Sequence, residues 1–173
     1  MVNICLCQVN NNQPKEKIFI DVLDMVNSDK SIDMIVLPEC FNAPYGSAFF
    51  DKHAEFKDGD THVFLQKLAK DNNAYVVGGS IIVKMKDKLV NTCFVFDRKG
   101  NEIGSYSKIH LFDIDLPKKK FKESDTLSPG NKPLILCTDF GHVGIGICFD
   151  LRFSKLAEFY RENNCSIIVY PGA

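Results

Sequence analysis

Apolar side chains recur along the chain with two periods, one typical of strands and the other of helices. Alternating or continuous apolar runs predict strands at residues 2–9, 34–37, 75–83, 89–96, 103–107, 133–137, 142–147 and 166–170. Apolar residues three and four positions apart predict three helices, one from Pro14 to Val26, one capped by Asp60 or Thr61, and one over residues 152–163. The run at 34–37 is wholly apolar, which is expected of a strand buried on both faces.

Predicted strands and helices alternate at both ends of the chain, with a run of strands between them. The strands at 75–83, 89–96 and 103–107 follow one another through short turns, which is the pattern of a meander. Residues 41–59, which contain the turn signal Asn42-Ala43-Pro44-Tyr45-Gly46, are predicted to be irregular, and residues 108–132 are predicted to form a long loop. This order of elements predicts an α/β fold in which helices cover a mixed sheet.

The stretch from Val143 to Arg152 combines a strand, a tight turn and the start of a helix. The turn falls at Cys148-Phe149-Asp150. A cysteine between a strand and a helix is exposed at the turn, and the helix N-terminus favours the thiolate form. Gly144 and Gly146 allow another backbone or a ligand to approach closely. Cys148 is therefore a candidate nucleophile, and the alternative is a buried cysteine that closes a core strand.

Three other ionisable residues lie near the ends of predicted strands. Glu39 follows the strand at 34–37, Lys108 follows the strand at 103–107, and Glu123 lies in the long loop beyond it. Ligands of α/β sheets bind outside the strand ends. A carboxylate, an ammonium group and a thiol gathered there would supply a base, an oxyanion stabiliser and a nucleophile.

Each of these residues also has a simpler interpretation, and the spacing alone does not exclude it. Glu39 could be a surface or helix-start carboxylate, and Lys108 a solvated lysine at a strand end. Glu123 could pair with the neighbouring lysines. His110, two residues beyond Lys108, is either a proton carrier or a hydrogen-bonded loop histidine.

Length, composition and charge narrow the class of protein. A chain of 173 residues with 45% apolar residues predicts one packed domain, over residues 1–173. A net charge of −1 without a basic patch argues against a nucleic-acid partner. No apolar run approaches the roughly 20 residues that a membrane span needs. Since no leader is apparent before the first strand, a cytoplasmic location is expected, with a mitochondrial one as the alternative.

The seven cysteines predict neither a disulfide framework nor a metal site. Their number is odd, and their spacing has no pattern of pairs. Cys5 and Cys7 share one face of the first predicted strand, but no second Cys or His pair completes four zinc ligands. Apart from Cys148, the cysteines are therefore predicted to fill the core.

Three segments together resemble the signature segments of one family. These are Leu37-Pro38-Glu39-Cys40-Phe41, Tyr106-Ser107-Lys108-Ile109-His110-Leu111 and Gly146-Ile147-Cys148-Phe149-Asp150-Leu151-Arg152-Phe153. In order and spacing they are similar to the three-part signature of the nitrilase (carbon–nitrogen hydrolase) superfamily. Further segments narrow the resemblance to its omega-amidase branch, namely Asn42-Ala43-Pro44-Tyr45-Gly46, Leu111-Phe112-Asp113-Ile114-Asp115, Phe121-Lys122-Glu123-Ser124, Leu127-Ser128-Pro129-Gly130 and Val169-Tyr170-Pro171-Gly172-Ala173.

The resemblance implies a fold and a set of catalytic roles. The fold would be the α-β-β-α sandwich of nitrilases. Cys148 would attack the amide carbon, and Glu39 would act as the general base. Lys108, with the backbone N–H of Phe149, would hold the oxyanion. Glu123 would position the lysine and share in proton transfer, and the reaction would need no cofactor.

The resemblance also implies a substrate, a short 2-oxo acid amide such as 2-oxoglutaramate or 2-oxosuccinamate. Such a molecule has a carboxylate at the end away from the amide, and Arg152 could bind it through two hydrogen bonds while Tyr45 orients it. The alternative for Arg152 is a structural ion pair with Asp150 or Glu158. Other members of the superfamily, deaminated-glutathione amidases and carbamoyl amidases, give alternative substrates.

The chain is shorter than the domain it resembles, which has roughly 250 to 280 residues. The sequence therefore predicts only the N-terminal part of the sandwich, incomplete at its C-terminus. The homodimer of the full-length family is correspondingly doubtful for this chain. An alternative to an active amidase is a catalytically silent fragment that acts only by associating with another protein.

Overall fold

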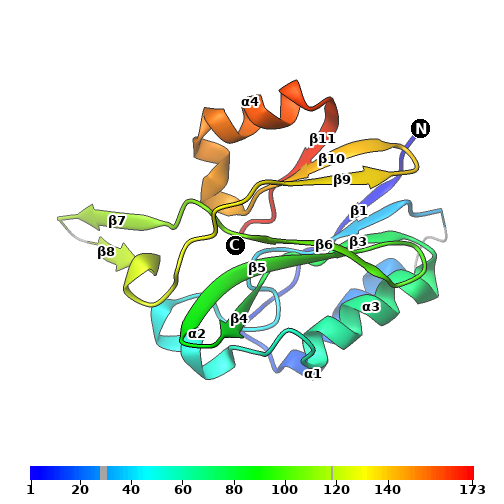
Figure 1. Ribbon diagram of the computed structural model, residues 1–173. Helices are drawn as coiled ribbons and strands as arrows, with labels where there is room; N and C mark the ends of the chain where they lie inside the picture. The colour runs from blue at the N-terminus through cyan, green and yellow to red at the C-terminus, as the bar shows by residue number, and fades with distance from the viewer. Residues whose placement is uncertain (28–30, 118) are drawn as a thin grey trace.

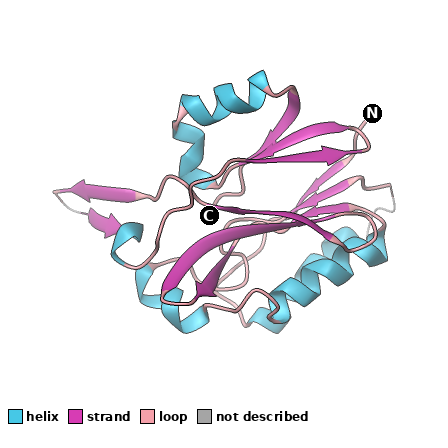
Figure 2. Cartoon of the chain, viewed as in Figure 1, coloured by secondary structure: helices cyan, strands magenta, loops and turns pink. Residues whose placement is uncertain are grey.

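Two β-sheets face each other and helices cover their outer sides in the computed structural model, which describes residues 1–27, 31–117 and 119–173 (Figure 1). Helices α1 (Lys15–Val26) and α3 (Asp60–Asn72) lie against one sheet, and α4 (Ser154–Glu162) lies against the other. Coloured by element, Figure 2 shows helices on both outer sides and strands between them. This is the α/β arrangement predicted from the order of elements.

The first sheet contains the N-terminal strands and the meander. β1 (Ile4–Leu6), β2 (Met34–Val36) and β3 (Tyr75–Val77) are parallel neighbours. β5 (Lys88–Phe96) runs antiparallel to β6 (Glu102–Ser107) on one side and to β3 and β4 (Ile81–Met85) on the other. The predicted meander is therefore confirmed.

The first strand of the meander is nevertheless broken, so the prediction of one strand over residues 75–83 is wrong. Gly79 has φ +56, a left-handed conformation that glycine adopts without strain. A Cβ at this position would lie 2.0 Å from the carbonyl oxygen of Pro38. Ser80 donates its backbone N–H to the same oxygen and accepts a hydrogen bond from the Cys40 N–H. The break therefore supports the turn that carries Glu39.

Gly79→Ala should destabilise the fold by about 2–4 kcal/mol, the sum of a left-handed alanine and a forced backbone shift. Urea denaturation would measure the loss. Gly172→Ala is the matched control, because no atom lies within 4 Å of its ideal Cβ, and its stability should stay within about 0.5 kcal/mol of the unaltered chain. Equal stability of the two variants would contradict the role assigned to Gly79.

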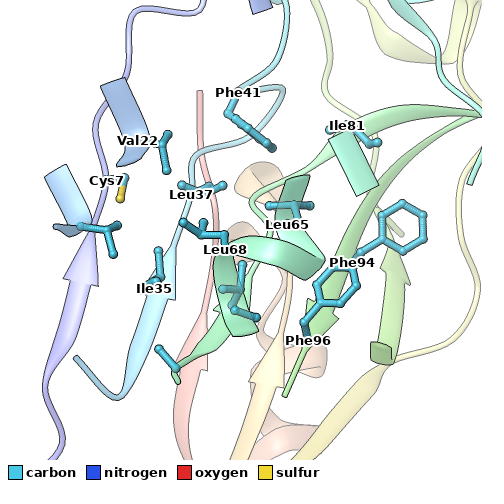
Figure 3. Close-up of a cluster of buried hydrophobic side chains, with 14 of the residues drawn as sticks. Cys7, Val22, Ile35, Leu37, Phe41, Leu65, Leu68, Ile81, Phe94 and Phe96 are labelled. Carbon is cyan, nitrogen blue, oxygen red and sulfur yellow. The ribbon is translucent and has the colours of Figure 1, made fainter. Parts of the chain in front are cut away.

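Alternating side chains of the first sheet build two separate cores. Ile35 and Leu37 point toward α1 and α3, where they pack with Val22, Leu65 and Leu68 (Figure 3). Met34 and Val36 point to the opposite side and pack between the two sheets. The strand is buried on both faces, as its wholly apolar run predicted.

The second sheet carries the stretch that ends in Cys148. Its order is β11-β10-β9, with β11 (Cys165–Val169) parallel and β9 (Leu134–Thr138) antiparallel to the central strand β10 (Gly141–Ile145). Val143 and Ile145 face the first sheet and pack in the core between the sheets. The opposite side of β10 faces α4, because a Cβ at Gly144 would meet the ring of Tyr160 at 2.5 Å.

Several predicted boundaries and one predicted loop are wrong. The irregular segment 41–59 contains α2 (Ser47–His53), and the predicted loop 108–132 contains the hairpin of β7 (Asp113–Leu116) and β8 (Lys119–Lys122) and a 3₁₀ turn at Glu123–Asp125. A second 3₁₀ turn, Cys148–Arg152, precedes α4, and β1 is shorter than predicted. In the described part of the chain, no helix combines the length and the apolar character that a membrane span requires.

Candidate active site

The residues singled out at the strand ends meet between the two sheets. Glu39 follows β2, Lys108 follows β6 and Cys148 follows β10. Glu39 and Lys108 are each 1% exposed, and Glu123, in the 3₁₀ turn after the hairpin, is fully buried. These carboxylates and this ammonium group are therefore not the surface charges of the simpler interpretation.

Lys108 joins the two glutamates. Its Nζ lies 2.8 Å from Glu39 Oε1 and 3.0 Å from Glu123 Oε1. Burial is the largest influence on the pKa of Lys108 and lowers it, but the charges and hydrogen bonds of Glu39 and Glu123 outweigh burial and raise this pKa above its usual value. The ammonium group therefore keeps its proton, and the three charged groups together carry a formal charge of −1.

Glu123 is further held by donors from two other segments. The hydroxyl of Tyr45 donates to Glu123 Oε1 at 2.8 Å, and the backbone N–H of Phe112 donates to Oε2 at 2.7 Å. Burial and the charge of Glu123 raise the pKa of Tyr45 above its usual range, so the phenol stays a donor. The hydroxyl that was predicted to orient a substrate thus contacts Glu123.

Cys148 occupies a strained elbow. Its φ is +45, in the left-handed region that a non-glycine residue adopts only when its surroundings hold it there. Its N–H donates to the carbonyl of Pro171 at 2.7 Å. Strain at such a position is common where a side chain has to be aimed at a ligand.

Asp150 is the anchor of this elbow. Its Oδ2 accepts hydrogen bonds from the Ile147 N–H at 2.9 Å and from the Tyr106 hydroxyl at 2.8 Å. Its Oδ1 contacts the backbone N–H and the ring Nδ1 of His110, and that ring stacks on Phe153 with centroids 3.6 Å apart. His110 is thus a hydrogen-bonded loop histidine, and Asp150 is occupied without Arg152.

The thiol of Cys148 is protonated in this environment. Burial raises the pKa of Cys148 to about 11, helped by the charge of Glu39 and a hydrogen bond to it, while Lys108 opposes the shift. The prediction that a helix N-terminus favours the thiolate is therefore wrong here. The physical reason is that a five-residue 3₁₀ turn follows Cys148 in place of a long helix, and a carboxylate lies beside the sulfur.

The reaction of Cys148 with iodoacetamide should accordingly speed up with pH. Because the thiolate reacts and the pKa is about 11, the rate should rise about tenfold per pH unit from pH 7 to pH 10. Mass spectrometry of the peptide that contains Cys148 would measure this rate separately from the other cysteines. A rate that levels off below pH 9 would contradict the raised pKa.

A cavity of about 370 Å³ opens onto the thiol. Most of its walls are apolar and few of its side chains are charged. The lining residues are Glu39, Tyr45, Phe112, Cys148, Phe149, Leu151, Arg152 and Ala173. Arg152 is exposed and makes no hydrogen bond or ion pair with any described residue, so the predicted alternative of a pair with Asp150 or Glu158 is wrong. A larger cavity of about 1020 Å³, lined by residues 55–60 and 84–88, contains none of the predicted site residues.

Two contacts to Glu39 were not anticipated from the sequence. Asn91 Nδ2 donates to Glu39 Oε1 at 2.9 Å, and the backbone N–H of Ala173 donates to Oε2 at 3.2 Å. The chain end marked C in Figure 1 lies between the two sheets, where this second contact is made. A sequence signal for Asn91 exists, because an amide within a buried apolar strand needs a partner.

Glycines near the elbow have a different function from the one predicted. Ideal Cβ atoms at Gly144 and Gly146 would lie 2.5 Å from the ring of Tyr160 and 2.4 Å from the ring of Tyr170. The glycines thus leave room for the rings of two tyrosines. The sequence had predicted the close approach of another backbone or a ligand. Among the described residues, no group of three or more His, Cys, Asp or Glu side chains is placed to hold a metal ion.

The carbon-nitrogen hydrolase family model matches residues 3–173. The chain belongs to this family. Among curated relatives, omega-amidase NIT2 of Bos taurus is 46% identical over 147 residues, which cover 84% of this chain and 53% of the relative. Omega-amidase NIT2 of Homo sapiens is 47% identical over 141 residues, covering 81% and 51%. The chain therefore spans about half the length of these relatives.

Solved structures confirm the fold of the carbon–nitrogen hydrolase family. Saccharomyces cerevisiae Nit3, a member of branch 10 of the nitrilase superfamily, superposes with a TM-score of 0.87 at 31% identity, covering 99% of this chain and 64% of Nit3. An amidase from Nesterenkonia sp. AN1 superposes with a TM-score of 0.85 at 17% identity, covering 99% and 67%, and supports the fold alone. The predicted nitrilase-like sandwich and the family resemblance are thus confirmed.

Proposed function

We propose that this protein is a thiol-dependent amidohydrolase that releases ammonia from the terminal amide of short 2-oxo acid amides, with 2-oxoglutaramate and 2-oxosuccinamate as the first candidates. The observation that carries the proposal is the buried ion cluster beside a thiol, in which Lys108 contacts both Glu39 and Glu123, and Glu39 and Cys148 line the same cavity. The name omega-amidase of the vertebrate relatives supports the choice of substrate.

The first chemical step forms a thioester on Cys148. Because the thiol is protonated at neutral pH, it needs a base, and the Glu39 carboxylate lines the same cavity as the thiol. Glu39 takes the thiol proton as the sulfur attacks the amide carbon. It then returns that proton to the amide nitrogen, which leaves as ammonia when the C–N bond breaks.

The oxyanion of the tetrahedral intermediate needs hydrogen-bond donors. The ammonium group of Lys108 has three N–H bonds, and its contacts with the carboxylates of Glu39 and Glu123 use two of them. The backbone N–H of Phe149 is the second donor in this proposal, since the N–H groups of Cys148 and Asp150 bond to Pro171 and Ile147. One such donor contributes a factor of about 10² to 10³ in rate.

Water completes the reaction. Glu39, again free of its proton after ammonia has left, accepts a proton from a water molecule that attacks the thioester carbon. The C–S bond breaks, the sulfur of Cys148 regains a proton, and the product is a carboxylic acid. The overall change is the conversion of an amide and water into an acid and ammonia.

The cavity suits a short substrate with an anionic end. Its volume of about 370 Å³ and its walls of Tyr45, Phe112, Phe149 and Leu151 favour a small apolar chain. Arg152 has no partner among the described residues and lies at this cavity, so its guanidinium is available to a substrate carboxylate.

Arg152→Lys should raise KM for 2-oxoglutaramate by about tenfold, because lysine cannot reproduce the two-pronged contact with a carboxylate. The KM for a neutral amide such as butyramide should stay unchanged. Initial rates of ammonia release over a range of substrate concentrations measure both constants. Equal loss with both substrates would contradict a carboxylate-binding role for Arg152.

The proposed function is tested by ammonia release from a panel of amides. The panel contains 2-oxoglutaramate, 2-oxosuccinamate, deaminated glutathione and a carbamoylated amino acid, each followed by product analysis. Fastest release from the 2-oxo acid amides supports the proposal, and preference for either of the last two assigns the protein to another activity of the family. No release from any amide would favour a catalytically silent chain that acts by association.

A further inference from the structure

The centre of β5 holds a buried amide, Asn91, that is 1% exposed. Side chains alternate along a strand, and Cys93 and Val95 of β5 pack between the two sheets. Asn91 therefore faces the same side, toward Cys148. The backbone carbonyl of Asn91 also accepts the N–H of Lys108 at 2.9 Å, so this residue contacts the candidate active site through its main chain as well.

One polar atom of this amide is not satisfied. Oδ1 of Asn91 is buried and has no hydrogen-bond partner among the described residues. A buried acceptor without a partner lowers stability, whereas an apolar residue of the same shape would avoid that loss. Packing alone would therefore favour an apolar residue at this position. We look for the function of Asn91 in the contact of its other polar atom, Nδ2.

That other atom is bound to Glu39. Asn91 Nδ2 donates to Glu39 Oε1 at 2.9 Å, and Lys108 Nζ donates to the same oxygen at 2.8 Å. The reverse orientation of the amide would place its oxygen against a carboxylate oxygen, and neither atom could donate. With two donors on Oε1, the one described donor to Oε2 is the Ala173 N–H at 3.2 Å, and this oxygen remains free to bond the thiol.

We propose that Asn91 is a positioning residue that fixes the rotation of the Glu39 carboxylate, so that Oε1 stays with Lys108 and Oε2 accepts the proton of Cys148. Lys108 alone cannot fix this rotation, because its ammonium group also bonds Glu123. Asn91 is neutral, so it orients the base without adding charge to the cluster. The inference rests on the proposed function only in using Glu39 as the base.

The test compares Asn91→Leu, which keeps the branched shape of the side chain but removes both polar atoms, with the unaltered chain. The first readout is the rate at which iodoacetamide alkylates Cys148 at pH 8, followed by mass spectrometry, with exposed Cys137 as the internal reference. We expect alkylation at least about threefold faster, since Glu39 held beside the sulfur helps to raise the pKa of Cys148, and the thiolate fraction grows when that carboxylate is no longer fixed. The Tm should stay within a few degrees, because removal of the unpartnered oxygen offsets the loss of the hydrogen bond to Glu39.

Thr92→Val is the matched control. Thr92 is the next residue of β5 and is also buried, but its hydroxyl bonds Ser107 and its side chain points to the other face of the sheet. This change removes one buried polar atom from the same strand and should leave the alkylation of Cys148 within twofold of the unaltered chain. Asn91→Asp, which replaces the donor by a second carboxylate, should instead slow alkylation, because the added negative charge raises the pKa of Cys148 further.

The outcomes separate positioning from packing. In amide hydrolysis, Asn91→Leu should lower kcat about tenfold with KM unchanged. Alkylation of Asn91→Leu within twofold of the unaltered chain would overturn the proposal. So would unfolding of both Asn91 variants beside a folded Thr92→Val, since the residue would then be structural. If the unaltered chain releases no ammonia, the proposed function fails, and the alkylation rates still decide the role of Asn91.

Discussion

Cys148→Ala should reduce ammonia release from 2-oxoglutaramate by at least about 10⁴-fold, because the variant has no group that can form a thioester. The sulfur is only partly buried, and its removal leaves the elbow contacts of Asp150 in place. The fold should therefore survive, with a Tm within a few degrees of the unaltered chain. Steady-state ammonia release and thermal unfolding of both chains measure the two quantities.

A thioester also gives direct evidence of the nucleophile. Acid quenching of the unaltered chain during turnover should yield a peptide with the acyl group on Cys148, and hydroxylamine should remove that group. Cys137→Ala is the matched control, since Cys137 is an exposed cysteine of β9 outside the cavity. Activity retained in Cys148→Ala would exclude Cys148 as the nucleophile, and equal loss in Cys137→Ala would show that the effect is not specific to Cys148.

Lys108→Met should damage both stability and activity. Methionine fills the space of the lysine stem but leaves the buried carboxylates of Glu39 and Glu123 without a countercharge. Breaking a buried ion pair in this way costs about 3–5 kcal/mol. Because the oxyanion also loses a charged donor, kcat should fall by a further factor of about 10² to 10³ in the molecules that remain folded.

Urea denaturation and ammonia release would measure the two effects of Lys108→Met separately. Lys155→Met on α4 is the matched control, because Lys155 is exposed and has no partner among the described residues. It should change stability by no more than about 0.5 kcal/mol. A Lys108→Met chain as stable as Lys155→Met would show that the lysine does not neutralise the two carboxylates.

The sequence predicted an element correctly where its local pattern of apolar residues agrees with the burial that the fold imposes. The wholly apolar strand at Met34–Val36, the meander and the strand before Cys148 were predicted because burial on one or both faces determines the spacing of apolar residues. The residues at three strand ends could be grouped because strand ends of an α/β sheet share a ligand-binding edge. Their burial and their mutual contacts were not predictable in this way.

Other features depend on contacts between distant segments. The break between β3 and β4 exists because Gly79 packs under Pro38, and a local period cannot show such a contact. In the hairpin of β7 and β8, apolar residues alternate with polar ones over only four residues of β7, and β8 has a single apolar residue, Phe121, so the pattern is too short to indicate a strand pair. The raised pKa of Cys148 follows from burial and from Glu39, 109 positions earlier in the chain.

The formal charge of the buried cluster has a consequence for product release. Next to Cys148, the two carboxylates of Glu39 and Glu123 face one ammonium group, that of Lys108. In the proposed reaction, the amide is neutral at its reacting end, but the acid formed from it would ionise within a few ångströms of Glu39. Like charges at that distance in a buried site repel strongly. Hydrolysis should thus turn a ligand that the site accepts into one that it expels, and product inhibition should be weak.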